Sequence, residues 1–258
     1  MNSPNPTCRS VMPPEPHYRV LRGQAAGPFV LICDHASNRV PAGLANLGLP
    51  PSELARHIGW DIGAAGVATH LSALLDAPAI FSAVSRLVID CNRQPDAAAL
   101  IPMISDGTVI PGNQAVDEAE RAARIAAWFT PYHDAIEALL EARAAAGLES
   151  VLVSVHSMTD CMAGVARPWQ ISMSSHVERR WVEPVLATLR APGDVVVGDN
   201  EPYAIDLGLD FSTPFHAMRR GLAHLQVEFR QDEVATDAGQ RAWAERFAAS
   251  VLTAFGAR

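Results

Sequence analysis

Short apolar runs alternate along the chain with longer stretches in which apolar residues recur at helical spacing. Short apolar runs are typical of buried strands, and long amphipathic stretches are typical of helices. The predicted strands cover Phe29–Cys33, Ala79–Phe81, Arg86–Asp90, Val151–Val155, Val195–Val197 and Leu225–Phe229. The predicted helices cover Ser52–Leu75, Val116–Ala146, Ser175–Leu189 and Asp237–Phe255. Because proline lacks an N–H group, we expect Pro131 to bend the second of these helices.

The order of these elements predicts the fold class. Strands separated by helices need crossover connections, which favour a mostly parallel, mixed central sheet with helices on both faces. Neither a linker nor an internal repeat interrupts the pattern, so we expect a single α/β domain over residues 26–258. Residues 1–25 are rich in proline, and we expect them to form a flexible leader.

Side chains that can bind a metal or take part in catalysis lie at the ends of several predicted strands. Asp34 and His35, Asn92 and Arg93, and His156 each follow a strand, and Glu228 lies within or at the end of the last strand, with Arg230 two residues on. In open α/β sheets, ligands bind beyond the carboxyl ends of the strands, so these side chains should meet at one edge. Neutral imidazoles bind metals, a carboxylate can act as a base, and arginine attracts an anionic substrate. The set is therefore the inventory of a hydrolytic zinc site.

Each of these residues also has a simpler interpretation. A histidine at a strand end is usually a polar residue with satisfied hydrogen bonds, and Arg86 and Arg93 could merely cap the sheet. Glu228 stands in an apolar strand, where a buried glutamate is rare unless it is paired. It could instead form an ion pair with Arg230 or face water from an edge strand. Spacing alone therefore indicates a metal hydrolase without deciding the matter.

Composition excludes several other classes of protein. The formal net charge is −8, which argues against nucleic-acid binding, because such binding needs a basic face. All 20 basic residues are arginine, so a Schiff-base lysine and a P-loop lysine are both excluded. No apolar run is long enough to span a bilayer, and we expect no membrane partner. The N-terminal sequence lacks the apolar centre of a signal peptide, so we expect a cytoplasmic protein with free cysteine thiols.

Six sequence blocks together resemble the N-formylglutamate amidohydrolase family. The resemblance extends from about Phe29 to Phe255 and rests on "DHASNRVP", "HIGWDIGAAGVA", "SRLVIDCNRQPD", "VSVHSMTD", "DNEPYAID" and "PFHAMRRGLAHLQVEFRQD". The family is similar in fold to zinc carboxypeptidases and aspartoacylases. The resemblance implies a metal-dependent enzyme that hydrolyses an N-formyl amino acid, with N-formyl-L-glutamate as reference substrate. The family name suggests a place in amino-acid catabolism.

The resemblance also implies metal ligands. Its two histidine positions fall on His35 and His156. The carboxypeptidase pattern has a glutamate three residues after its first histidine, where this chain has Asn38, and an amide oxygen is a poor zinc ligand beside a carboxylate. Asp61 is the candidate replacement, although it could equally cap the helix that begins there, and His57 could share its face. Zinc is the expected metal, but the same ligands accept other divalent metals.

The resemblance places a catalytic glutamate at Glu228, and chemical reasoning suggests the remaining roles. Glu228 is expected to act as general base and acid. Either Arg86 or Arg93 is expected to stabilise the oxyanion, while the other binds a substrate carboxylate. His216 is expected to contact the substrate or support Glu228, and Asp34 to orient His35 or cap its turn. The further expected substrate contacts are Asn38, Asn92, Asn200 in the turn-forming block "GDNEPY", and Arg230.

Two rival interpretations keep the same scaffold. In one, the enzyme cleaves a different N-acyl amino acid or a related amide, because function belongs to the site and not to the fold. In the other, the chain is a metal-free protein that binds small carboxylates through Arg86 and Arg93. Both keep a small-molecule carboxylate as partner. The sequence does not indicate an oligomeric state.

Overall fold

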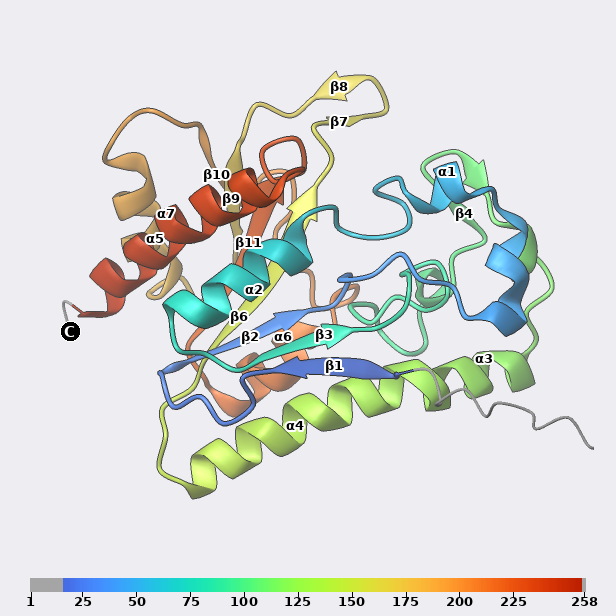
Figure 1. Cartoon of the computed structure of the whole chain (residues 1–258), viewed down its shortest axis with the longest axis horizontal. Coiled ribbons are helices and arrows are strands. Elements are labelled where there is room, and N and C mark those ends of the chain that lie inside the picture. Colours follow the sequence, from blue (N-terminus) through green and yellow to red (C-terminus); the bar gives the residue numbers. More distant parts are fainter. Residues whose placement is uncertain (1–15, 257–258) are drawn as a thin grey trace, which may run out of the picture.

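One seven-stranded mixed sheet organises the chain, whose computed structural model describes residues 16–256 (Figure 1). Across the sheet the strands are β1 (Tyr18–Leu21), β3 (Ala79–Ser82), β2 (Phe29–Cys33), β6 (Val151–Met158), β11 (His224–Arg230), β9 (Ile171–Ser174) and β10 (Val197–Asp199). The central strands β3, β2, β6 and β11 are parallel, whereas β1, β9 and β10 run the opposite way. The predicted single-domain α/β fold with a mostly parallel, mixed sheet is confirmed.

Helices cover both faces of this sheet (Figure 1). Helices α2 (Ala64–Leu74), α5 (Val182–Arg190) and α7 (Asp237–Gly256) pack on one face, and α4 (Thr130–Ala145) and α6 (Ser212–His216) pack on the other. Alternate side chains of β2 divide between the two layers: Leu31 packs toward α2 and α7, while Ile32 packs toward α4. Because both faces are covered, β2 is apolar at every position.

The remaining elements are short and lie mostly outside the sheet. Two hairpins, β4–β5 and β7–β8, form separate two-stranded sheets. Their strands are β4 (Ile104–Ser105), β5 (Thr108–Val109), β7 (Cys161–Met162) and β8 (Val165–Ala166). The short helices are α1 (Pro51–Leu54), α3 (Glu118–Arg124), a π-helical turn (Ile125–Phe129), and 3₁₀ turns at Ala42–Gly48, Ala98–Leu100, Pro111–Asn113 and Met218–Arg220. Within residues 16–256, no helix has the length and apolar character needed to cross a membrane.

Several predicted elements differ from the structure. The strand predicted at Arg86–Asp90 is wrong, because the segment forms a buried turn in which the Val88 N–H donates to the Ser85 carbonyl at 2.9 Å. The helix predicted over Ser52–Leu75 is interrupted between α1 and α2. Gly63, which precedes α2, has a φ of +82°, a conformation that ends a helix and favours glycine.

Other differences concern where elements begin and end. The helix predicted at Ser175–Leu189 starts only at Val182, and the strand predicted at Val195–Val197 is displaced to β10. Strand β9 was not predicted. The long helix predicted over Val116–Ala146 is present as α3, the π-helical turn and α4 in succession, and this turn ends just before Pro131.

The predicted leader, residues 1–25, contains an ordered strand. Strand β1 pairs antiparallel with β3, with Tyr18 opposite Ser82. Residues 1–15 lie outside the described residues, as does Cys8. Alternation in β1 is weak because most of its side chains are exposed at the edge of the sheet, so the apolar pattern did not reveal it.

Candidate metal centre and active site

A cavity of about 420 Å³ lies at the carboxyl ends of the central parallel strands. It is lined by His35 just after β2, His156 near the end of β6, and Glu228 near the end of β11. Asp61 reaches it from the loop before α2, and the turn that holds Arg86 closes one side. The predicted meeting of these side chains at one sheet edge follows from the parallel order of β2, β6 and β11.

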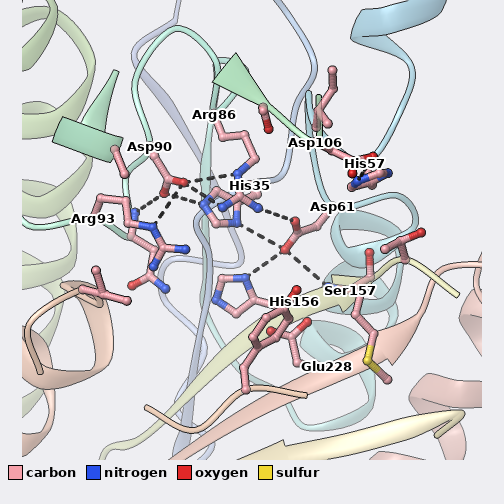
Figure 2. Close-up of a pocket in the computed structure, with 18 of the residues that line it drawn as sticks. His35, His57, Asp61, Arg86, Asp90, Arg93, Asp106, His156, Ser157 and Glu228 are labelled. Carbon is pink, nitrogen blue, oxygen red and sulfur yellow. Dashed lines mark hydrogen bonds and ion pairs between the residues drawn. The ribbon is translucent and has the colours of Figure 1, made fainter. Parts of the chain in front are cut away.

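Three buried side chains converge on one point in this cavity (Figure 2). One possible ligand atom from each of His35, Asp61 and His156 lies within 4.8 Å of the others. One oxygen of Asp61, Oδ2, is 2.8 Å from Nδ1 of His156 and 3.3 Å from Nδ1 of His35. Two imidazole nitrogens and one carboxylate are ligands that zinc and related divalent metals accept, so this group could hold a metal ion.

Each imidazole of this group is held through its other nitrogen by a second carboxylate. Nε2 of His35 is 2.7 Å from Oδ1 of Asp90. Nε2 of His156 is 3.3 Å from Oδ2 of Asp34 and also lies 2.9 Å from the hydroxyl of Ser154. Metal-binding histidines almost always have such a partner, which fixes the tautomer and aims the free nitrogen. The donor set therefore fits a divalent metal. Asp34 was expected to orient His35 or to cap its turn, but its carboxylate contacts His156 instead.

Asp61 is positioned by the backbone around it. Its N–H donates to the carbonyl of His35 at 3.0 Å, and the N–H of Ser157 donates to its Oδ2 at 3.3 Å. Burial acts to raise the pKa of Asp61, but the two histidines outweigh burial and hold that pKa well below its usual range. The alternative of a helix cap does not apply, because α2 has no side-chain cap and begins after Gly63.

Glu228 stands beside this group as a buried carboxyl. In the register of the parallel strands β6 and β11 it lies opposite His156. No described residue donates a hydrogen bond to its carboxyl oxygens, and burial raises its pKa to about 7. The alternatives of an edge strand and an Arg230 partner are wrong, because β11 lies between β6 and β9 and Arg230 pairs with Asp232. A carboxyl with a pKa near neutrality can both take up and release a proton.

Three further predicted residues line the cavity. Arg86 lies 2.7 Å from Oδ2 of Asp90 and 3.4 Å from Oδ1 of Asp61. Arg93 lies 2.8 Å from Oδ1 of Asp210. Asn92 is buried and accepts hydrogen bonds from the backbone N–H groups of residues 211 and 212 through its side-chain oxygen. The side chain of Asn92 therefore holds the start of α6 in place.

Four predicted site residues do not line the cavity: Asn38, Asn200, His216 and Arg230. The Asn200 side chain accepts from the Ser175 N–H at 2.7 Å and braces its own turn. His216 lies on the other face of the sheet, on α6, with Nδ1 2.6 Å from Oε1 of Glu137 on α4. Their expected contacts with substrate are not supported by these positions, because each side chain is engaged elsewhere or lies outside the cavity.

His57 also differs from its expected place. It lines the cavity but lies 3.4 Å from Asp106 near the β4–β5 hairpin, away from the group formed by His35, Asp61 and His156. Sequence reasoning missed Asp90, which holds His35, and Arg167, which lines the cavity. Asp90 follows an apolar run directly, which could have marked it as a site residue, but its role toward His35 depends on the turn that the structure forms there.

The fold and site define a class of protein. A parallel sheet that presents a buried His–Asp–His group and a carboxyl of raised pKa in one cavity is an arrangement typical of hydrolytic enzymes. The family model for N-formylglutamate amidohydrolase matches residues 27–235 of the chain. The chain belongs to this family and is an amidohydrolase.

Two solved structures have the same fold. The gene product Atu2144 from Agrobacterium tumefaciens is 34% identical, with a TM-score of 0.90 over 93% of this chain and 95% of that one. An N-formylglutamate amidohydrolase from Ralstonia eutropha JMP134 is 19% identical and has the same fold, with a TM-score of 0.64 over 93% of this chain and 97% of that one. No curated protein matches the chain.

Proposed function

We propose that this chain is a divalent-metal-dependent amidohydrolase that removes the formyl group from an N-formyl amino acid, with N-formyl-L-glutamate as the first substrate to test. The observation that carries the proposal is the arrangement of the cavity: a carboxyl group with no hydrogen-bond partner among the described residues faces the His35, Asp61 and His156 group. The family and the matched amidohydrolase support the reaction class.

His35, Asp61 and His156 are proposed to hold the metal. When bound, a divalent metal supplies Lewis-acid polarisation of the amide carbonyl and makes a nearby water more acidic. Asp90 and Asp34 each contact the Nε2 atom of one imidazole. These contacts keep the Nδ1 atoms directed at the metal position. Binding of a small carboxylate alone would not require two imidazoles oriented in this way, so the metal-free interpretation is the weaker one.

Glu228 is proposed to move the proton. It takes a proton from the attacking water and delivers it to the nitrogen of the leaving amino acid, because its carboxyl lies in the cavity beside the metal group without a hydrogen-bond donor among the described residues. Arg93 is proposed to stabilise the negative charge that develops on the carbonyl oxygen. Its guanidinium lies 2.8 Å from Asp210 and 3.8 Å from Asp90. Arg86 also contacts Asp90, but its other partner is Asp61, a proposed metal ligand. The cytoplasmic location stays a prediction.

The test is release of formate from N-formyl-L-glutamate by metal-depleted protein before and after zinc is added, beside N-acetyl-L-glutamate and N-formyl-L-methionine. We expect formate only with metal present. Glu228→Gln should lower kcat by roughly 10²–10⁴-fold while metal content is unchanged. Glu149→Gln, an exposed glutamate outside the cavity, is the matched control.

Two results would contradict the proposed chemistry, and a third would contradict only the proposed substrate. Full activity without metal, or in Glu228→Gln, would exclude the proposed chemistry. Metal binding with no release of formate, but release of acetate from N-acetyl-L-glutamate, would move the substrate to another acyl group and leave the roles of the residues intact.

A further inference from the structure

The arginines of the cavity are not alike in their partners. Arg86, Arg93 and Arg167 all line it. Arg86 is paired with Asp90 and Asp61, and Arg93 is paired with Asp210. The positive charge of these two guanidinium groups is therefore already compensated by carboxylates of the protein. An anionic substrate would have to compete with those carboxylates to bind either of them.

Arg167 is different because it has no carboxylate partner in residues 16–256. It lies directly after β8, and only 9% of its surface is exposed. No carboxylate oxygen of a described residue lies within 4.0 Å of it. Among the described residues, its side chain donates only to neutral oxygens, the hydroxyl of Tyr203 at 2.8 Å and the carbonyl of Thr159 at 3.4 Å. Burial of a charged group without a counter-charge is unfavourable, so the cavity is incomplete without an anion.

The guanidinium of Arg167 is held in a defined orientation. Its central carbon lies 5.0 Å from the centre of the Tyr203 ring. The backbone N–H of Arg167 donates to the carbonyl of Asp160 at 2.8 Å, and its carbonyl accepts from Arg230 at 3.2 Å. Arg230, which was expected to bind substrate, therefore supports the backbone of Arg167 instead. Two donated hydrogen bonds leave further N–H groups of this guanidinium available for a ligand.

Arg167 is also at a suitable distance from the proposed reaction centre. His156 and Thr159 both line the cavity, and they are three residues apart along an extended segment, which corresponds to about 10 Å. Since Arg167 contacts the Thr159 carbonyl, a substrate between the metal ligands and Arg167 would span several bonds. An acyl amino acid, with its amide at one end and a carboxylate at the other, has this form.

We propose that Arg167 binds a carboxylate of the substrate and makes the enzyme selective for anionic N-acyl amino acids. The proposal rests on the proposed function for the reaction itself. A guanidinium binds a carboxylate through two parallel hydrogen bonds, a geometry that a lysine ammonium cannot reproduce. Arg167 is thus assigned to substrate selection, and Arg86 and Arg93 to the surroundings of the reacting amide.

The test compares N-formyl-L-glutamate with its two monoamides, N-formyl-L-glutamine and N-formyl-L-isoglutamine, in the wild type, Arg167→Met and Arg167→Lys. We expect the wild type to prefer the diacid over one monoamide by roughly tenfold to a hundredfold in kcat/KM, mainly through KM. Arg167→Met should lose this preference. Its kcat/KM should fall only for substrates that carry the carboxylate bound by Arg167. Arg167→Lys should recover part of it. Arg241→Met, which removes an exposed arginine on α7, is the control.

The proposal would be overturned if Arg167→Met showed the same preference among the three substrates as the wild type, even if deformylation proceeds. A second measurement separates the failure of this proposal from failure of the proposed function. If no formyl substrate is cleaved by the wild type, calorimetric binding of L-glutamate to the zinc-loaded proteins decides: at least tenfold weaker binding by Arg167→Met supports the role of Arg167. Equal affinity in both proteins, or binding by neither, contradicts it.

Discussion

Each histidine of the candidate metal group uses one nitrogen toward Asp61 and the other toward a carboxylate outside the group. For His35 that outer carboxylate is Asp90, which also accepts from Arg86 and from the backbone N–H of Asn92. The imidazole is therefore held in its tautomer by a residue that is itself fixed by other contacts. This arrangement prepares Nδ1 of His35 as a ligand before any metal arrives.

Replacement of Asp90 tests this arrangement at the scale of one residue. We expect Asp90→Asn to weaken zinc binding by about 10–100-fold, because the neutral amide holds His35 and Arg86 less firmly. Competition with a zinc-binding dye measures the affinity. Asp232→Asn removes an exposed carboxylate outside the cavity and should leave the affinity unchanged. Equal affinities in Asp90→Asn and the wild type would show that Asp90 does not orient the ligand.

Individual residues also mark the limit of what sequence reasoning could predict. His35, His156 and Glu228 were predicted because parallel strands bring their carboxyl ends together. The side chain of His216 could not be placed from its sequence block. The block sits close to Glu228 along the chain, but α6 turns His216 toward α4, away from the cavity. The position of Arg167, away from any carboxylate of residues 16–256, depends on the β7–β8 hairpin. The sequence of this hairpin shows no periodic pattern of apolar residues that could have predicted it.

The segment between α1 and α2 is the element that brings Asp61 over the sheet. Sequence periodicity predicted one helix there, but Gly59 and Gly63 interrupt it. A Cβ atom at Gly59 would lie 2.3 Å from the Leu54 carbonyl oxygen, and one at Gly63 would lie 2.2 Å from the Val234 carbonyl oxygen. At both glycines the backbone therefore lies too close to a neighbouring carbonyl for a side chain to fit. Asp61 lies between these two glycines.

We expect Gly63→Ala to destabilise the fold by more than the cost of the backbone conformation alone. The matched control is Gly193→Ala, since Gly193 also has a positive φ but has open space where its Cβ would be. The left-handed conformation costs about 1–2 kcal/mol for alanine at both positions. Only Gly63→Ala adds the clash with Val234. Urea unfolding measures the two free energies, and equal losses would contradict the close packing.

Helices α4 and α6 are joined by a buried chain of polar groups on the other face of the sheet. His216 contacts Glu137 through Nδ1, and its Nε2 lies 2.8 Å from Nδ1 of His133. The second nitrogen of His133 donates to the Cys91 carbonyl at 2.9 Å, next to the turn that carries Asn92. Burial, with a further contribution from His216, lowers the pKa of His133 to about 3, so this ring is neutral.

The chain of polar groups is expected to support folding and not chemistry. His216→Ala removes one partner each from His133 and Glu137 and should lower the free energy of unfolding by about 1–3 kcal/mol. His70→Ala, which removes a more exposed histidine paired with Asp237, should have a smaller effect. The kcat of the metal-loaded His216→Ala protein should equal that of the wild type. A large fall in kcat at unchanged metal content would restore a role in the reaction.

For the whole molecule, the fold was more predictable than the exact elements. Apolar runs identified β2 and the first part of β6, and in β11 apolar residues alternate with Gln226 and Glu228 although nearly the whole strand is buried. The same signal gave a wrong prediction at Arg86–Asp90, where the apolar residues belong to a turn whose side chains pack into the core. Periodicity cannot separate a buried turn from a short strand. Strand β9 was missed because two of its four residues are serines, although it is fully buried.

The site depends on long-range assembly of these parts. Sheet topology brings His35, His156 and Glu228 together, but Asp61, Asp90 and Arg167 come from loops whose paths are set by tertiary packing. This explains why the third metal ligand remained open between Asp61 and Asn38 at the level of sequence. In the structure, Asp61 joins the two histidines and Asn38 does not line the cavity.

The most direct measurement is therefore the metal content of Asp61→Ala and Asn38→Ala beside the wild type, after purification with zinc and removal of excess. We predict about one metal ion per chain in the wild type and in Asn38→Ala, and little in Asp61→Ala. Far-ultraviolet circular dichroism of each protein checks that it is folded. Retention of zinc by folded Asp61→Ala, or its loss from folded Asn38→Ala, would contradict the His35, Asp61 and His156 site.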